Sequence, residues 1–275
     1  MMKKNNNSLL LSIPYILWML VFTLIPLGVV AYYALTDPDT GNFTLQNIQD
    51  LGMFLPTLGI STAYALVSAL ICLLLGYPVA YYIAHRSPTA QKILYMLVML
   101  PMCMSFLLRT LAWVGLLESN GIINALLGAL HLKPITMIGT PAAVILGMVY
   151  NYLPYMILPL YAVIVKIDHR LIEAAEDLGC SNTQVFSRVI LPLSMPGILS
   201  GITMVFVPAV STFYISQKLG GTETLLIGDI IERLFKSAGN PNLGAALSLV
   251  LMLLVFICTG VMNRFGGDEE GGVLV

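Results

Sequence analysis

Residues 166–192 read KIDHRLIEAAEDLGCSNTQVFSRVILP and lie between two long apolar segments. Asp168 is placed to cap a helix, and the spacing of the apolar side chains after it predicts one amphipathic face. Gly179 permits a sharp turn, and the Ser-x-x-Gln pattern that starts at Ser181 is a capping box that begins a second helix. Pro192 marks the bend into the next apolar segment. The stretch therefore predicts a helix, a turn and a second helix at a membrane surface.

The composition around this stretch is that of a membrane protein. Of the 275 residues, 58% are hydrophobic and only 10% are charged, whereas soluble domains carry about 25% charged residues. A bilayer-spanning helix needs about 20 mostly apolar residues, because its backbone must satisfy its own hydrogen bonds. We therefore expect an all-α, polytopic integral membrane protein whose six transmembrane helices cover 9–35, 58–84, 93–117, 141–165, 193–217 and 243–263.

The distribution of Lys and Arg predicts the orientation of these spans. With both termini inside, eight of these residues lie on the cytoplasmic side and four on the external side, which favours an N-in, C-in topology and a cytoplasmic 166–192 loop. The first apolar run is too long for the core of a cleavable signal peptide, so we expect a retained helix. We expect one transmembrane permease domain over 1–265, and a disordered Gly- and acid-rich tail over 266–275.

The cytoplasmic loop also carries a spaced motif. Glu173-Ala174-Ala175 is followed after three residues by Gly179, and after nine more by Val189-Ile190-Leu191-Pro192. This pattern resembles the EAA loop of ABC-importer permeases, with valine at a position that is usually isoleucine. The resemblance implies that an ATPase docks on the loop, and the residues it assigns to coupling are Glu173, Ala174, Ala175, Gly179, Leu191 and Pro192. The alternative is an amphipathic linker that only lies on the bilayer.

The resemblance extends over nearly the whole chain. Segments on both sides of the loop, such as 152–161, 195–198 and 225–228, are similar to the B-type permease subunit of spermidine/putrescine ABC importers. This family implies a type I ABC importer permease in the cytoplasmic (inner) membrane of a prokaryote, acting in polyamine transport. It also implies four kinds of partner: a C-type permease subunit, two copies of a cytoplasmic ABC ATPase that hold ATP and Mg, an extracytoplasmic polyamine-binding protein, and membrane lipid.

The sequence contains none of the common catalytic or metal-binding motifs that we searched for. There is no G-x-x-x-x-G-K-[ST] phosphate loop, so we do not expect an ATPase site in this chain. The three histidines do not form an H-E-x-x-H pattern, and the four cysteines form no C-x-x-C pair. We therefore expect no catalytic residue, no resident cofactor and no metal, and no nucleic-acid partner. Energy must come from another subunit.

Polar and aromatic residues in the fourth and fifth spans are candidates for a translocation path. A polyamine is an extended cation that calls for carboxylates or carbonyls at its ammonium groups and for aromatic faces along its methylenes. The candidates are Tyr150, Asn151, Tyr155, Phe213, Tyr214 and, at the outer end of the third span, Glu118. The alternative for each is helix packing. An intramembrane Arg is costly, so we expect Arg109 to have a structural partner or a contact near the outer interface, and not to bind the cargo.

Three competing functions remain open at this point. A related ABC importer for another small solute, such as a phosphonate, an opine or iron, has the same permease features. An ion-coupled secondary transporter or channel predicts acidic residues in the middle of spans, and the clearest charge-free windows contain none. A membrane anchor or assembly factor that does not transport has no need of the cytoplasmic loop.

Overall fold

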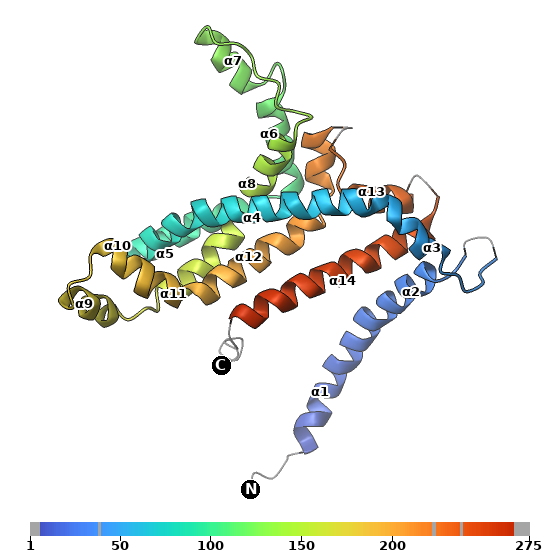
Figure 1. The fold of residues 1–275 in the computed structure, drawn as a ribbon, viewed down its shortest axis with the longest axis horizontal. Helices are drawn as coiled ribbons and strands as arrows, with labels where there is room; N and C mark the ends of the chain where they lie inside the picture. Colours follow the sequence, from blue (N-terminus) through green and yellow to red (C-terminus); the bar gives the residue numbers. More distant parts are fainter. Residues whose placement is uncertain (1–5, 38–39, 222–223, 237–238, 267–275) are drawn as a thin grey trace. The chain divides into compact units, whose positions relative to one another are not determined.

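A computed structural model of the chain describes residues 6–37, 40–221, 224–236 and 239–266 (Figure 1). Within these ranges the regular structure is helical, apart from one isolated antiparallel bridge between Thr36 and Phe43. Five helices are long and apolar enough to cross a membrane, and a sixth span results if one bent pair of helices counts as a single span. The predicted all-α, polytopic membrane architecture is therefore confirmed.

The chain divides into two compact units, and each is described by itself. The first unit is Met1–Leu55 with Ile230–Leu253, and the second is Pro56–Asp229 with Leu254–Val275. Two helices, α13 (Ile227–Lys236) and α14 (Pro241–Gly266), run from one unit into the other along the chain, and α4 (Leu55–Ala84) has only its first residue in the first unit.

The first unit joins the N-terminal span to the start of the last helix. Its elements are α1 (Asn6–Met19), the π-helical η1 (Leu20–Leu24), α2 (Ile25–Ala34), α3 (Gln46–Gln49) and the 3₁₀ segment η2 (Asp50–Phe54). The last carbonyl oxygens of a helix lack hydrogen-bond donors within the helix. At the end of α2 and just after it, side-chain amides donate to the carbonyl oxygens. Asn47 Nδ2 donates to Ala34 O at 3.2 Å and to Thr36 O at 2.9 Å, and Asn242 Nδ2 donates to Thr36 O at 2.6 Å.

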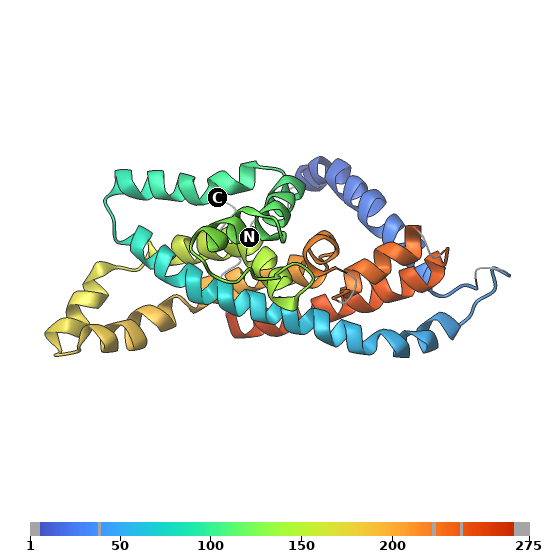
Figure 2. The ribbon, with the colours of Figure 1, turned by 90° about the horizontal axis from the view of Figure 1, so that it is seen from above.

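The second unit holds the remaining helices. They are α4 (Leu55–Ala84), α5 (Pro88–Met99), the 3₁₀ segment η3 (Leu100–Cys103), α6 (Phe106–Leu117), α7 (Ile122–Ala129), α8 (Pro141–Ile164), α9 (His169–Asp177), α10 (Asn182–Val185), the π-helical η4 (Phe186–Ile190), α11 (Leu191–Leu193), α12 (Met195–Val210) and the π-helical η5 (Ser216–Gly220). Figures 1 and 2 agree that α9 and α10 lie at the end of this unit where α4 and α8 end.

The core of the second unit lies between α8 and α12, which pack side by side. Small residues let the two backbones approach, as is usual between helices in membranes. A Cβ on Gly201 would lie 2.6 Å from Met156 Sδ, and one on Gly197 would lie 3.1 Å from the Pro159 carbonyl oxygen. Met156 and Phe206 are fully enclosed at this contact. The pair forms a closely fitted seam, from which the loop at 166–192 projects.

Two predicted spans are interrupted in the structure. The third, 93–117, breaks at Met104 and Ser105, whose extended backbones separate η3 from α6. The fifth, 193–217, ends as an α-helix at Val210, and non-helical residues precede the next turn. Both breaks follow a proline, Pro101 and Pro208, whose missing amide N–H removes a helix hydrogen bond. The sequence stays apolar across both breaks. Hydropathy therefore predicted two spans that are longer than the continuous helices in the structure. The predicted tail 266–275 lies outside the described residues, except for Gly266, which ends α14.

Candidate functional site

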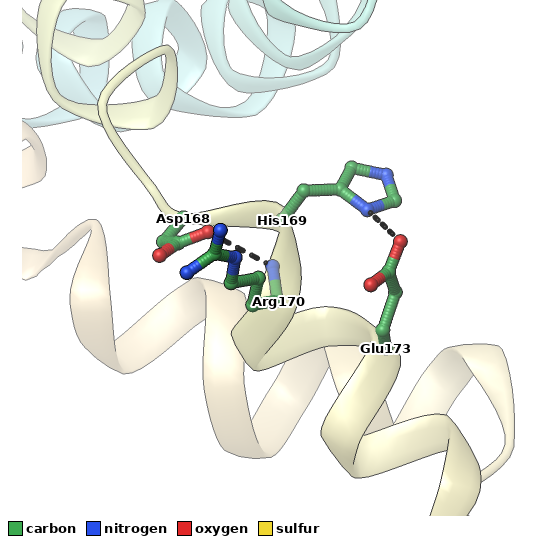
Figure 3. A network of polar contacts seen from close by, with 4 residues as sticks. All are labelled: Asp168, His169, Arg170 and Glu173. Atoms are coloured by element: carbon green, nitrogen blue, oxygen red, sulfur yellow. Dashed lines mark hydrogen bonds and ion pairs between the residues drawn. The ribbon is translucent and has the colours of Figure 1, made fainter.

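The loop at 166–192 begins with a capped helix, as predicted. Asp168 is the N-cap of α9, and its Oδ1 accepts a hydrogen bond from the Arg170 backbone N–H at 3.0 Å. His169 Nδ1 lies 3.1 Å from Glu173 Oε1, one turn further along the helix (Figure 3). Both side chains of this pair are largely exposed, so the contact orients the first turn and contributes little to stability.

The turn after α9 is held by backbone hydrogen bonds that only a glycine accommodates easily. Gly179 has φ = +84°, in the left-handed region. Its N–H donates to Glu176 O at 2.8 Å, and the Cys180 N–H donates to Ala175 O at 3.1 Å. These two bonds form a Schellman motif, which closes the C-terminus of a helix around a left-handed residue. The prediction of a sharp turn at Gly179 is confirmed.

The second helix of the loop starts with the predicted capping box and is fastened to α4. The Ser181 backbone N–H donates to Gln184 Oε1 at 2.8 Å, and the reciprocal contact of the box is present. Phe186 then meets two tyrosines of α4 edge to face, with ring centroids 5.5 Å from Tyr77 and 6.2 Å from Tyr81. Such aromatic pairs stabilise a contact beyond simple burial. The sequence pattern marked Phe186 as apolar, but its partners on α4 came only from the structure.

The surface of α9 is open to solvent in this chain. None of its residues is buried. Leu178, at its C-terminus, is 86% exposed and Leu171 is 49% exposed. Glu173 and Ala174 are exposed beside them, and Ala175 is half-buried. An apolar and small-residue face with acidic neighbours is thus presented without a partner from the described residues.

A hinge joins the loop to α12. Leu191 and Pro192 lie in the single turn α11, and the helical segment before Ser194 is bent by 62° from α12. Ser194 Oγ donates to Leu191 O at 2.9 Å and lies 2.8 Å from Tyr77 Oη. Because the serine proton is already used, the tyrosine hydroxyl is the donor in the second bond. The predicted bend near Pro192 is present, and it is tied to α4.

Several of the candidate path residues lie against α6. The Tyr150 ring is 5.3 Å from Trp113, and the Tyr214 ring is 6.3 Å from Phe106. Phe213 is 41% exposed beside Tyr214, in the non-helical stretch after α12. Phe106 and Trp113 were not among the predicted site residues. Their seven-residue spacing, which puts both on one helical face, was the available signal.

The remaining candidates lie in different surroundings. Tyr155 is half-buried, with its ring 6.4 Å from Tyr152. Asn151 is 1% exposed, and its Nδ2 donates to Gly147 O at 2.9 Å, which directs it toward the helix backbone. Glu118 follows α6 with an exposed side chain, and its carbonyl oxygen accepts from Asn124 Nδ2. The structure therefore brings Tyr150 and Tyr214 against α6, and it gives Tyr155, Asn151 and Glu118 other neighbours.

Arg109 is a buried charge on α6. It lies on the face of α6 that carries Phe106 and Trp113, and it is 5% exposed. Its Nε and Nη1 have no hydrogen-bond partner among the described residues. These two nitrogens therefore show no hydrogen bond within the described part of the chain, and the expected contact of Arg109 stays a prediction.

The described chain thus combines helices of membrane-spanning length, one bent pair of helices and an exposed, capped loop. Residues 74–266 match the family model described as "Binding-protein-dependent transport system inner membrane component". The chain belongs to this family.

Individual relatives agree with the family match. The chain is 38% identical over 257 residues to the spermidine/putrescine transport system permease protein PotB of Haemophilus influenzae, with 90% of each chain covered. It is 37% identical to the PotB of Escherichia coli, with 86% of this chain and 90% of the relative covered. A solved structure of a bacterial ABC transporter involved in alginate import has the same fold, with a TM-score of 0.74, 19% identity, and 96% and 97% of the two chains covered.

Proposed function

We propose that this chain is a transmembrane permease subunit of an ATP-driven importer for spermidine and putrescine in a bacterial inner membrane. The observation that carries the proposal is the match to permeases named for that transport, at 37% and 38% identity over most of both chains. The intact loop motif supports it, because Glu173 is exposed on the helix that Asp168 caps, and Gly179 and Pro192 occupy the turn and hinge positions that a docking element needs.

The proposed complex contains further subunits. A C-type permease forms the other half of the path, two copies of a cytoplasmic ABC ATPase hold ATP and Mg, and an extracytoplasmic protein delivers the polyamine. The exposed face of α9 fits the ATPase, because its apolar and small side chains allow close approach while Glu173 offers charge to basic groups. One structurally similar transporter was solved with a periplasmic protein bound.

The loop has two routes by which it can pass a displacement to the helices. One route runs from α9 through η4 and the ring of Phe186 to Tyr77 and Tyr81 on α4. The other runs through the hinge at Ser194 into α12, which is fitted against α8 at Gly201. ATP binding at the ATPases pushes on α9, both routes move together, and the path opens outward. Hydrolysis returns it to the inward-open state.

The aromatic cluster against α6 is the proposed cargo path. A permeation path must bind weakly, because a tightly held cation does not leave. Tyr150, Phe213 and Tyr214, with Trp113, offer ring faces to methylenes and ammonium groups. Asn151 is enclosed by the packing and contributes less to such a path.

Uptake of labelled spermidine and putrescine tests the substrate. Cells lacking their own polyamine importers receive the whole set of transporter genes, with or without this one, and membrane expression is verified in both. We expect uptake that requires this chain and is competed by unlabelled polyamine. No uptake with all subunits present would reject the polyamine assignment and turn attention to the ligand of the binding protein.

Charge reversal on α9 tests the docking. Glu173→Lys replaces the exposed carboxylate and also removes its 3.1 Å contact with His169 Nδ1. His169→Gln is the matched control, because it removes the same contact and keeps the carboxylate. We expect Glu173→Lys to lose most ATPase co-purification and uptake, and His169→Gln to retain both. Unchanged assembly in Glu173→Lys would count against docking on α9.

Truncation of ring side chains tests the path. Phe213→Ala removes one aromatic face from the proposed path, and Tyr155→Ala removes one from α8, the helix that carries Tyr150. We expect reduced uptake and altered selectivity between spermidine and putrescine, with normal assembly of the complex. Near-normal transport and selectivity in both variants would remove the path hypothesis while leaving the docking proposal intact.

A further inference from the structure

A cavity of about 310 Å³ lies beneath the coupling helix, where α4 and α8 end. Its lining comes from four elements of the second unit and the residues that directly follow two of them. The lining residues are Ala84, His85, Arg86, Ile164, Val165, Ile167, His169, Ile172 and Ile190. The proposed orientation, with the 166–192 loop on the inner side, puts this cavity at the inner face of the membrane.

The polar side chains of the lining are all basic in type. They are His85, Arg86 and His169, and the other lining residues are aliphatic. No carboxylate belongs to the lining, and two acids of the adjacent loop are already engaged. Asp168 caps the start of α9, and Glu173 binds His169. The lining therefore combines an arginine charge with an aliphatic wall and contains no carboxylate.

Local contacts orient the basic side chains. The backbone carbonyl oxygens near them already accept hydrogen bonds. His85 Nδ1 lies 2.9 Å from Tyr81 O, so this nitrogen carries a proton and Nε2 is left for another group. The Arg86 guanidinium lies 4.0 Å from the centre of the Tyr82 ring. The carbonyl oxygens of Ala84 and Arg86, which end α4 and would repel an anion, each accept a hydrogen bond from Gln91 Nε2 at 2.9 Å.

We propose that this cavity binds the phosphate of an anionic phospholipid from the inner leaflet. The charge of Arg86 and the free nitrogen of His85 suit a phosphate, because charge-assisted hydrogen bonds to phosphate oxygens are among the stronger ones in proteins. The isoleucines suit the glycerol and the first methylenes of the acyl chains, which inorganic phosphate lacks. Basic pockets between helices on the cytoplasmic side are known to take lipid head groups.

The position of the cavity gives the lipid a regulatory effect. His169 and Ile172 belong to α9, and Ile190 belongs to η4, so part of the wall is the docking element itself. A bound lipid fills the space between this element and the ends of α4 and α8. Occupancy therefore restrains α9 and links the anionic lipid content of the membrane to ATPase coupling. This consequence rests on the proposed docking, whereas lipid binding does not.

Lipid retention by the complete transporter tests the proposal. The complex of this chain with its partner subunits is placed in phosphatidylcholine nanodiscs containing phosphatidylglycerol, and the phosphatidylglycerol that it retains after transfer to detergent is counted by native mass spectrometry. The variant is His85→Gln with Arg86→Gln. Lys92→Gln is the matched control, because it removes an exposed charge from the same inner face outside the cavity. Arg86→Lys preserves the charge and serves as the conservative variant.

We expect the double variant to bind phosphatidylglycerol at least about tenfold more weakly, because loss of the Arg86 contact alone predicts about that factor and the His85 contact is lost as well. Lys92→Gln should match the unmodified chain, Arg86→Lys should retain part of the binding, and added inorganic phosphate should not displace the lipid. Equal retention in the double variant overturns the proposal, as does an equal loss in Lys92→Gln.

Two other results also overturn it. Displacement by inorganic phosphate would assign the cavity to a free anion. Loss of the ATPase from the double variant with lipid retention unchanged would make the cavity a protein contact. Polyamine uptake is not the readout, so failure of the substrate assignment leaves this test intact.

Discussion

The α8–α12 pair and the loop at 166–192 belong to the same unit and are stabilised in opposite ways. In α8, 61% of the apolar window is buried, and Gly201 and Met156 meet in close contact with α12. In α9, no residue is buried, and the element is shaped by a cap at Asp168 and a glycine turn at Gly179. The core depends on contacts between distant residues, whereas the loop depends on contacts within a few residues.

This difference indicates which changes each region tolerates. In a closely packed interface an added methyl group displaces its neighbours and causes strain, because protein cores are as dense as organic crystals. A locally capped, exposed helix can change its surface without unfolding, which suits an element that has to meet a partner. Substitutions in the first region should therefore lower stability, and those in the second should lower coupling.

The largest effect is expected from Gly201→Leu. A Cβ at this position lies 2.6 Å from Met156 Sδ and 3.3 Å from Met156 O, so α8 and α12 must separate. Overpacking of this kind costs about 1–3 kcal/mol, and we expect a clearly lower melting temperature of the purified complex and loss of uptake. Gly260→Leu is the control, because nothing lies within 4 Å of a Cβ there. Equal melting of the two variants would show that the seam is not closely fitted.

A smaller and different effect is expected from Gly179→Val. A Cβ here has open space, but φ = +84° disfavours a branched residue, at a cost of about 1–3 kcal/mol confined to the turn. We expect unchanged melting of the transmembrane core, but several-fold less ATPase co-purification. Gly59→Val, also in open space but without positive φ, should change neither. A fall in melting temperature comparable to that of Gly201→Leu would contradict the division between core and loop.

The smallest effect is expected at the hinge, where the two regions meet. Ser194→Ala leaves the buried Tyr77 hydroxyl without its 2.8 Å partner, which should cost about 1 kcal/mol. Tyr77→Phe removes the other side of the bond, and the double variant should be no less stable than Ser194→Ala alone. Melting of the four proteins forms a double-mutant cycle. Additive losses would show that the two hydroxyls are not coupled.

Local signals predicted the loop well. Hydropathy predicted six spans, of which five are single helices and the sixth requires counting the bent pair as one span. Asp168, Gly179 and the box at Ser181 act through their own neighbours in the chain, so the sequence alone places them. Hydropathy missed the break at Met104, because an apolar residue can have either a helical or an extended backbone.

The contacts of the candidate path were less predictable. The pairing of Trp113 with Tyr150, like that of Phe186 with Tyr77, joins residues on different helices. Such pairs depend on how the helices pack, and a single sequence does not contain that information. Arg109 is expected to have a contact because an isolated charge in a membrane is costly; its Nε and Nη1 show no hydrogen bond among the described residues, so this contact stays a prediction.

The hinge at Ser194 makes α12 a lever. Its 16 residues extend about 24 Å at 1.5 Å per residue. A change of about 10° in the bend at Ser194 would then displace the far end of the helix, at Val210, by about 4 Å. The aromatic residues Phe213 and Tyr214 follow directly after that end. A rotation too small to disturb the fold of the loop would thus move these rings by about the width of a methylene chain.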